Sequence, residues 1–231
     1  MSGPASVNEA GRQYTDASAQ GAPRYSKHER VADGAVHVMG LALVLGACFY
    51  LLGRVPQASP AGIVPALGLY AVGMATSFGC SAAYNLAPAG PFKALLRRFD
   101  HAAIFLMIAG TYTPIALLAI GGTWGWAVLA IVWTGAGLGA TIKLLAPGRF
   151  ERASLIAYLA LGWVCLAALP RLIEMLTPPQ FGLLVLGGVL YSLGVLLHLS
   201  TRLPYHNALW HLSVLIAAGF HYALVLSITA V

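Results

Sequence analysis

Seven long apolar segments, separated by short joins rich in proline, glycine and charged residues, dominate the pattern of the chain. Each segment is close to the roughly 20 residues that a helix needs to cross a bilayer. The alternation of apolar and polar residues that is typical of outer-membrane barrel strands is missing. The pattern therefore predicts an all-α, polytopic membrane protein, a bundle of seven transmembrane helices. The predicted spans are residues 32–54, 61–86, 99–120, 124–145, 153–173, 180–201 and 207–230.

Composition supports the same fold class and separates a tail from the bundle. With 59% hydrophobic and 9% charged residues, the chain is too apolar for a water-soluble fold. Residues 1–26 are rich in Ser, Ala, Gly and Gln and contain no apolar run, so we predict a disordered N-terminal tail there. Residues 27–231 then form one seven-helix transmembrane domain. The three cysteines lie inside apolar segments and predict no disulfide framework.

The charged residues predict how the bundle is oriented. Lys and Arg number 13 against seven Asp and Glu, and they lie at the ends of the apolar segments rather than in one patch. When the joins are assigned to alternate sides of the membrane, all but Arg54 and Arg171 fall on one side. The positive-inside rule makes that side the cytoplasm. We predict a cytoplasmic N-terminus, an external C-terminus, and membrane lipids rather than nucleic acid as partners.

A set of polar residues lies at the ends of four predicted spans, where consecutive helices run in opposite directions and meet at the cytoplasmic side. Several of these residues are spaced four apart, which places them on one helix face. Ionisable groups within a membrane are costly and usually face a cavity or a partner. We therefore predict a polar cavity, with the alternative that these residues only fasten helices together. They are Glu29, Asp33, His37, Ser81, Asn85, Asp100, His101, Asn207 and His211.

Several motifs resemble those of the bacterial hemolysin III family, which is related to the progestin and adiponectin receptors and more remotely to the alkaline ceramidases. The resemblance runs in order from about residue 29 to the C-terminus, and it implies a seven-helix bundle with a cytoplasmic N-terminus. The motifs are the Glu29, Asp33, His37 series, Asp100-His101-Ala-Ala-Ile-Phe-Leu, Ala-Gly110-Thr-Tyr-Thr-Pro114, Gly187-Gly188-Val-Leu-Tyr191-Ser-Leu-Gly194 and Trp210-His211-Leu-Ser-Val-Leu before His221.

The resemblance also implies a metal site, although this chain departs from it. In that family zinc is bound by a histidine four residues after the serine of helix two and by two histidines four apart in helix seven, with the aspartate of helix three close to the metal through water. The serine, the aspartate and one histidine match Ser81, Asp100 and His211. The other two ligand positions are Asn85 and Asn207. Carboxamides are weak zinc ligands, so a bound zinc does not follow from the resemblance.

Two structural alternatives remain open for these residues. The amides of Asn85 and Asn207 can hydrogen bond to each other and to Asp100, which would preserve a junction of helices two, three and seven without metal. A different metal arrangement can draw on Asp100, His211 and either His37 or His101. From the resemblance, Ser81 and Asp100 are the candidate catalytic residues and His211 is the candidate metal ligand.

Three functions are compatible with the pattern. The preferred one is a receptor-like or regulatory membrane protein whose polar cavity binds a lipid or small molecule and whose zinc site is degraded. The alternative is a zinc-dependent hydrolase of a lipid amide or ester, with Asp100 as the base. A water-filled pore is disfavoured because the outer halves of the predicted spans are almost wholly apolar.

Overall fold

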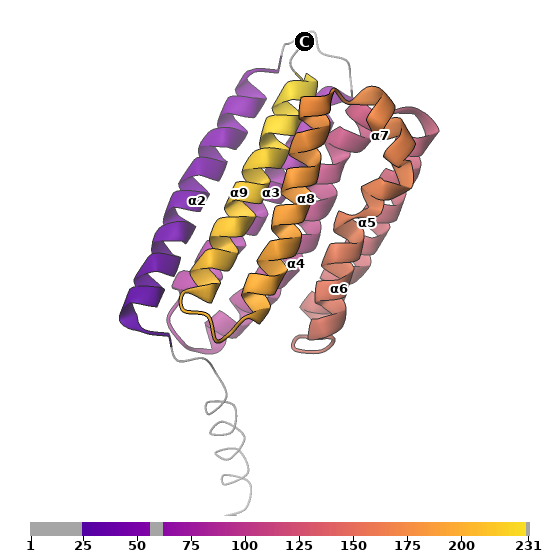
Figure 1. The fold of residues 1–231 in the computed structure, drawn as a ribbon. Helices are drawn as coiled ribbons and strands as arrows, with labels where there is room; N and C mark the ends of the chain where they lie inside the picture. The colour runs from indigo at the N-terminus through magenta and orange to yellow at the C-terminus, as the bar shows by residue number, and fades with distance from the viewer. Residues whose placement is uncertain (1–24, 56–61, 230–231) are drawn as a thin grey trace, which may run out of the picture.

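The computed structural model describes residues 25–55 and 62–229, and all seven predicted spans are helical there (Figure 1). Two spans are composite. The third joins α4 to a π-helical turn, and the fifth joins α6 to α7 through a 3₁₀ turn. The elements are α2 (Lys27–Gly53), α3 (Ile63–Leu86), α4 (Pro91–Pro114), the π-helix Ile115–Ile120, α5 (Gly122–Leu145), α6 (Glu151–Gly162), the 3₁₀ helix Val164–Ala168, α7 (Leu169–Met175), α8 (Pro178–Leu199) and α9 (His206–Thr229).

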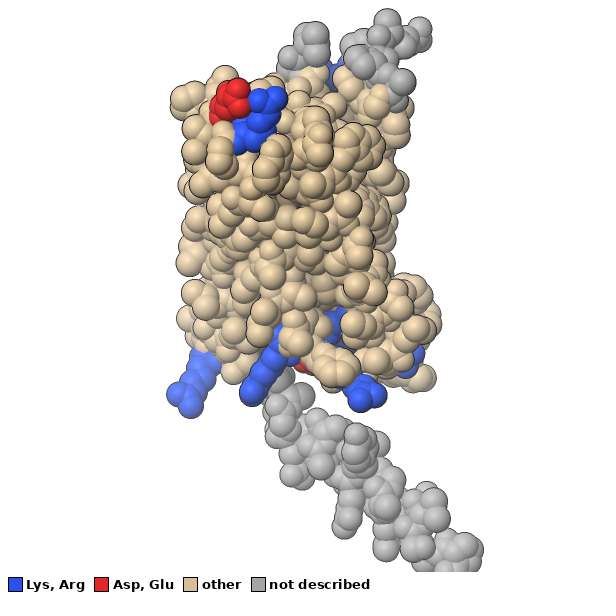
Figure 2. Space-filling view, turned by 90° about the vertical axis from the view of Figure 1, so that its right-hand side faces the viewer, with Lys and Arg blue, Asp and Glu red and all other residues tan. Residues whose placement is uncertain are grey.

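The basic side chains on the face shown in Figure 2 gather mainly at one end of the bundle, and a broad band without charged residues lies between the two ends. This is the end at which α2, α4, α6 and α9 begin, and we call it the basic end (Figure 1). The last turn of α9 lies at the opposite end. The cytoplasmic location of the basic end stays a prediction. Most of the predicted tail, residues 1–24, lies outside the described residues.

Two helices begin well before the predicted residue, each for a local reason. The first helix begins at Lys27 rather than at residue 32, because Ser26 and Glu29 form a capping box in which each side chain accepts a backbone N–H of the other. The third helix begins at Pro91, since proline is favoured in the first helical turn, where its missing N–H costs no hydrogen bond. Both extra stretches are too polar to stand out in a hydropathy pattern.

The fifth span was predicted as one continuous helix, and the structure breaks it after Gly162. A break inside a membrane exposes backbone polar groups that need partners. The hydroxyl of Tyr112 is the partner of two of these backbone groups. It donates to the carbonyl oxygen of Gly162 at 2.7 Å and accepts the N–H of Cys165 at 2.9 Å. The tyrosine of the Gly-Thr-Tyr-Thr-Pro motif therefore caps the broken helix.

The third span is the centre of the bundle. Of the residues in its 18-residue apolar stretch, 72% are buried, against 39% or less in each other span. Glycine allows α3 to approach it closely. A methyl group at Gly73 would lie 2.9 Å from the carbonyl oxygen of Leu106, and one at Gly110 would lie 2.8 Å from that of Leu69. Lipid provides no hydrophobic driving force for helix association, so close van der Waals packing at such small residues drives it instead. The central position of α4 directs Asp100 and His101 towards the interior.

Candidate functional site

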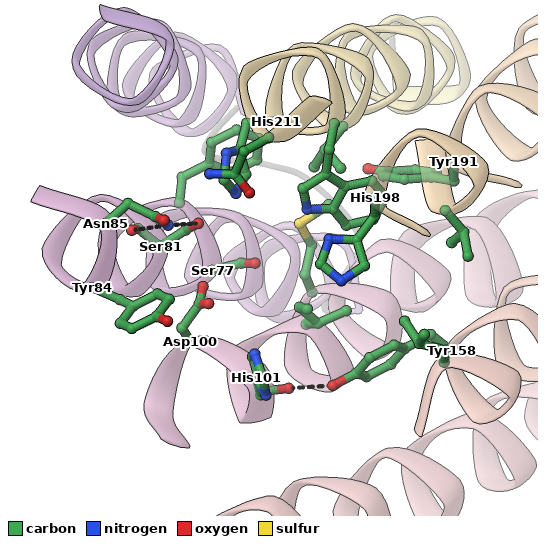
Figure 3. Close-up of a pocket in the computed structure, with 18 of the residues that line it drawn as sticks. Ser77, Ser81, Tyr84, Asn85, Asp100, His101, Tyr158, Tyr191, His198 and His211 are labelled. Carbon is green, nitrogen blue, oxygen red and sulfur yellow. Dashed lines mark hydrogen bonds between the residues drawn. The ribbon is translucent and has the colours of Figure 1, made fainter. Parts of the chain in front are cut away.

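A cavity of about 720 Å³ lies inside the bundle at its basic end, and its lining reaches as far as Gly162 and His221; Figure 3 shows part of that lining. Residues of α2, α3, α4, α6, α8 and α9 line it, whereas none of the lining residues comes from α5. All nine of the polar residues singled out in the sequence, from Glu29 to His211, are among the lining residues. The cavity is within the size range of sites for small organic ligands, about 300–1,000 Å³.

Asp33 joins the first and last spans on one side of this cavity. Its Oδ1 lies 2.7 Å from Nδ1 of His211, and its Oδ2 accepts a hydrogen bond from the amide of Asn207 at 2.9 Å. Asn207 and His211 are four residues apart in α9, so one helix face presents both groups to the carboxylate. The two carboxylate oxygens are therefore each used for a contact with α9.

His37 completes a three-residue cluster with Asp33 and His211. Its side chain is 4% exposed, and its Nε2 lies 3.7 Å from Oδ1 of Asp33, which is beyond hydrogen-bond distance. Its ring centroid is 4.1 Å from that of His211. One ligand atom from each of the three residues lies within 4.8 Å of the other two, so the cluster is able to hold a metal ion.

The amides at the family's other two ligand positions do not form the junction that we considered. Asn85 donates to the carbonyl oxygen of Ser81 on its own helix at 2.9 Å, and Asn207 donates to Asp33 of α2. No hydrogen bond among the described residues joins the two amides. The junction hypothesis is wrong because it omitted α2, whose carboxylate competes for the Asn207 amide. In Figure 3, Ser81, Asn85 and Asp100 lie across the cavity from His211.

These contacts test whether the family's zinc arrangement fits this chain, and it does not. Two of its three imidazole positions are amides, and the NH₂ group of each amide already donates a hydrogen bond to a protein oxygen. The remaining carboxamide oxygens are poor ligands for zinc, which prefers imidazole, thiolate and carboxylate. We therefore assign no metal chemistry to the family's zinc position, formed here by Asn85, Asn207 and His211.

His101 belongs to a second polar cluster on the α6 side of the cavity. Its Nδ1 lies 3.8 Å from the carboxylate of Glu151, which also pairs with Lys143 at 2.9 Å and with Arg97 at 3.3 Å. Lys143 is 2% exposed, although the sequence suggested only a role in orientation. The sequence pattern missed Glu151 because it stands in a join, outside the predicted fifth span.

Glu29 lines the cavity mouth, and both its carboxylate oxygens are engaged. One caps α2, and the other accepts the backbone N–H of Tyr205 at 3.0 Å, which fastens the join before α9. Nearby, the hydroxyl of Tyr25 lies 3.4 Å from Nε2 of His206. Burial, and then the charge of Asp33, raise the pKa of Tyr25. Tyr25 therefore stays protonated at the mouth and can donate a hydrogen bond.

Several lining residues were not among the site residues predicted from the sequence. Tyr158 donates to the carbonyl oxygen of His101 at 2.8 Å, and the indole of Trp163 donates to Ser192 at 3.0 Å, linking α6 to α8. His198 lies at the basic end of α8 and lines the cavity (Figure 3). Its position near the end of its span, at the depth shared by the other polar residues, was the available clue. His221 also lines the cavity, and its Nε2 lies 3.2 Å from the carbonyl oxygen of Leu184 in α8.

Comparison with known proteins gives concordant matches. A sequence model of the family described as "Haemolysin-III related" matches residues 25–222. The chain is 37% identical to "Hemolysin-3" of Bacillus cereus over 187 residues, which cover 81% of this chain and 85% of that protein. It is 33% identical to the "Hemolysin-3 homolog" of Bacillus subtilis (strain 168) over 187 residues, or 81% and 88% of the two chains.

Proposed function

The chain belongs to the hemolysin III family and is a multi-pass bacterial membrane protein. From this premise we propose that it is a receptor-like or regulatory protein. Its cavity binds a single-chain amphiphile without hydrolysing it. The observation that carries the proposal is the cavity itself, which combines a charged mouth with an apolar interior. The relation of the family to the progestin and adiponectin receptors is consistent with such a role.

The lining changes along the depth of the cavity in the way that an amphiphile requires. Charged side chains such as Arg30, Lys93 and Glu151 line it near the basic end, at the first turns of their helices. Further along the helices the lining is supplied by aliphatic side chains such as Ile108 and Val195. A polar head group fits the first region and an acyl chain fits the second, since each group then meets surface of its own polarity.

The absence of hydrolysis is inferred from the amides. A zinc hydrolase needs an ion that polarises the bond or activates a water. Asn85 and Asn207 stand at two positions where the family has zinc ligands, and both amides are bonded to protein oxygens. The polar groups that remain at these positions bind ligands well by hydrogen bonding but supply no Lewis acid.

A pair of neighbouring residues tests the binding proposal. Val195 lines the cavity and is 7% exposed, whereas Leu196 is 59% exposed on the outer face of the same helix. The protein, purified in mild detergent, is incubated with an extract of bacterial lipids and examined by native mass spectrometry. We expect the parent and Leu196→Trp to retain a bound amphiphile and Val195→Trp to lose it. Equal retention by the two variants, or no retention by the parent, contradicts the proposal.

One observation favours a second candidate, hydrolysis of a lipid amide or ester. Ser81 and Asp100 both line the cavity opposite His211 (Figure 3), so a hydroxyl and a carboxyl face the space in which a ligand would lie. The two functions are distinguished by incubating the protein with a long-chain lipid amide and a matching ester. Release of fatty acid by the parent, lost in Asp100→Asn, would establish the hydrolase.

A further inference from the structure

We propose that Asp33, His37 and His211 form a binding site for a divalent transition-metal ion, for which zinc fits the donor set, between α2 and α9. This site differs from the one implied by the family, because it uses a carboxylate and an imidazole of the first span and needs no residue of α3. It goes beyond the binding of an amphiphile, which requires no metal.

The geometry brings three donors of the right kind to one point. Oδ1 of Asp33 lies near both rings, 2.7 Å from Nδ1 of His211 and 3.7 Å from Nε2 of His37. One ligand atom of each residue lies within 4.8 Å of the others. Zinc bonds to nitrogen and oxygen are about 2.1 Å long, so atoms up to about twice that distance apart can share one ion after small side-chain movements.

His37 is the residue that points to an ion. Its Nε2 is buried and has no hydrogen-bond partner, although the side chain is only 4% exposed. Buried polar atoms nearly always have a partner, and the exceptions call for an explanation such as an ion. A purely hydrogen-bonded junction of Asp33, Asn207 and His211 accounts for every contact of the cluster except this nitrogen. A metal ion between His37 and Asp33 accounts for it.

The surroundings match those of known metal sites. Two histidines and one carboxylate form a common set of three zinc ligands. The Asp33 oxygen that is not nearest the rings accepts the amide of Asn207 at 2.9 Å. Such a hydrogen bond orients a ligating carboxylate. We therefore assign Asn207 as a positioning residue. It does not bind the metal itself, as the family's histidine at this position does, but orients the Asp33 carboxylate.

The test is zinc binding by the purified full-length protein in detergent, stripped with a chelator and titrated with zinc in the absence of lipid. His37→Phe is the decisive variant, because it keeps a ring and removes no hydrogen bond. We expect the parent to bind zinc stoichiometrically and His37→Phe to bind it more than about 100-fold more weakly, whereas Asn207→Ala loses about 10- to 100-fold. Monodisperse elution and an unchanged metal-free melting temperature show that His37→Phe remains folded.

Two matched variants exclude other locations in the same cavity. His101→Phe removes a histidine that lies against Glu151, and Asp100→Asn removes the carboxylate that matches the aspartate of the family's helix three. Both are expected to bind zinc as the parent does. Zinc that is lost in Asp100→Asn but kept in His37→Phe overturns the assignment, as does a monodisperse parent that binds no zinc. Because no lipid is present, the result is independent of the amphiphile experiment.

Discussion

Asp33 and His211 are 178 positions apart in the sequence, and their side chains meet with 2.7 Å between Oδ1 and Nδ1. The contact joins the first span to the last at the basic end of the bundle. Asp33 also accepts a hydrogen bond from Asn207, so one carboxylate is fixed by two groups of α9. Asp33 therefore links α2 to α9 through two contacts.

The first prediction concerns this carboxylate. Asp33→Leu leaves the donors of Asn207 and His211 unpaired in a largely buried place, and we expect a loss of about 1–3 kcal/mol of unfolding free energy. Asp100→Leu is the control, and it should cost less. Thermal melting in detergent, with the parent melted alongside, measures both. A smaller loss for Asp33→Leu than for Asp100→Leu would show that the contact with α9 contributes little.

The second prediction concerns the cap of the broken span. Tyr112→Phe removes a hydroxyl that bonds to Gly162 and Cys165, so two backbone groups lose their partner inside the membrane. Because membrane hydrogen bonds contribute about 0.6–1.7 kcal/mol each, we expect a loss of about 1–3 kcal/mol. Tyr70→Phe is a matched control, since the hydroxyl of Tyr70 is buried without a partner and its removal should be neutral or stabilising. Equal melting temperatures for the two variants would refute the capping role.

The sequence predicted the seven spans because each has an apolar run that hydropathy detects. It did not predict the start of the first helix, although the capping box of Ser26 and Glu29 is visible in the letters, because the four residues after Ser26 are polar. The break in the fifth span also left a clue, Gly162 followed by Pro170. Its partner, Tyr112, is 50 residues away from Gly162, and no local pattern connects them.

The candidate site was predictable within helices but not between them. The four-residue spacing placed Asp33 with His37, and Asn207 with His211, on single helix faces. Which helices adjoin could not be read, because the spans are apolar on most sides and no polar face marks the neighbour. The pairing of α2 with α9 therefore came only from the structure, and with it the partner of Asn207.

The third prediction concerns the buried lysine. Glu151→Gln leaves the charge of Lys143 without its carboxylate, and we expect a loss of about 1–3 kcal/mol, less than for a fully buried pair because Glu151 is 39% exposed. Adding Lys143→Met to this variant should recover most of the loss. Glu174→Gln, which breaks the exposed pair with Arg171, is the control and should change stability by less than about 1 kcal/mol. Additive losses in the double variant would argue against the pair.

The fourth prediction is the orientation of the bundle. A cysteine placed at Arg202 in the join between α8 and α9, in a variant without the three native cysteines, should be shielded from an impermeant thiol reagent in intact cells and react after the cells are opened. A C-terminal reporter that requires an external location should be active. The basis is that 11 of the 13 basic residues belong to one side. Labelling of residue 202 in intact cells would invert the assignment.

The last prediction tests whether Asn85 and Asn207 stand at former ligand positions. Asn85→His and Asn207→His together would place three imidazoles, with His211, around the point that the family's zinc would occupy, beside Asp100. To separate this site from the one between α2 and α9, both changes are made in the His37→Phe background, where we expect little zinc binding.

In that background the double change should restore stoichiometric zinc, while either single change should restore little, because two imidazoles hold the ion far less well than three. Adding Asp100→Asn should weaken the restored binding, since the carboxylate lies next to the metal in the family. The readout is metal content after gel filtration, with melting temperatures to confirm folding. If the folded double variant binds no zinc, the two asparagines do not face a common point with His211, and the match to the family's ligand positions fails.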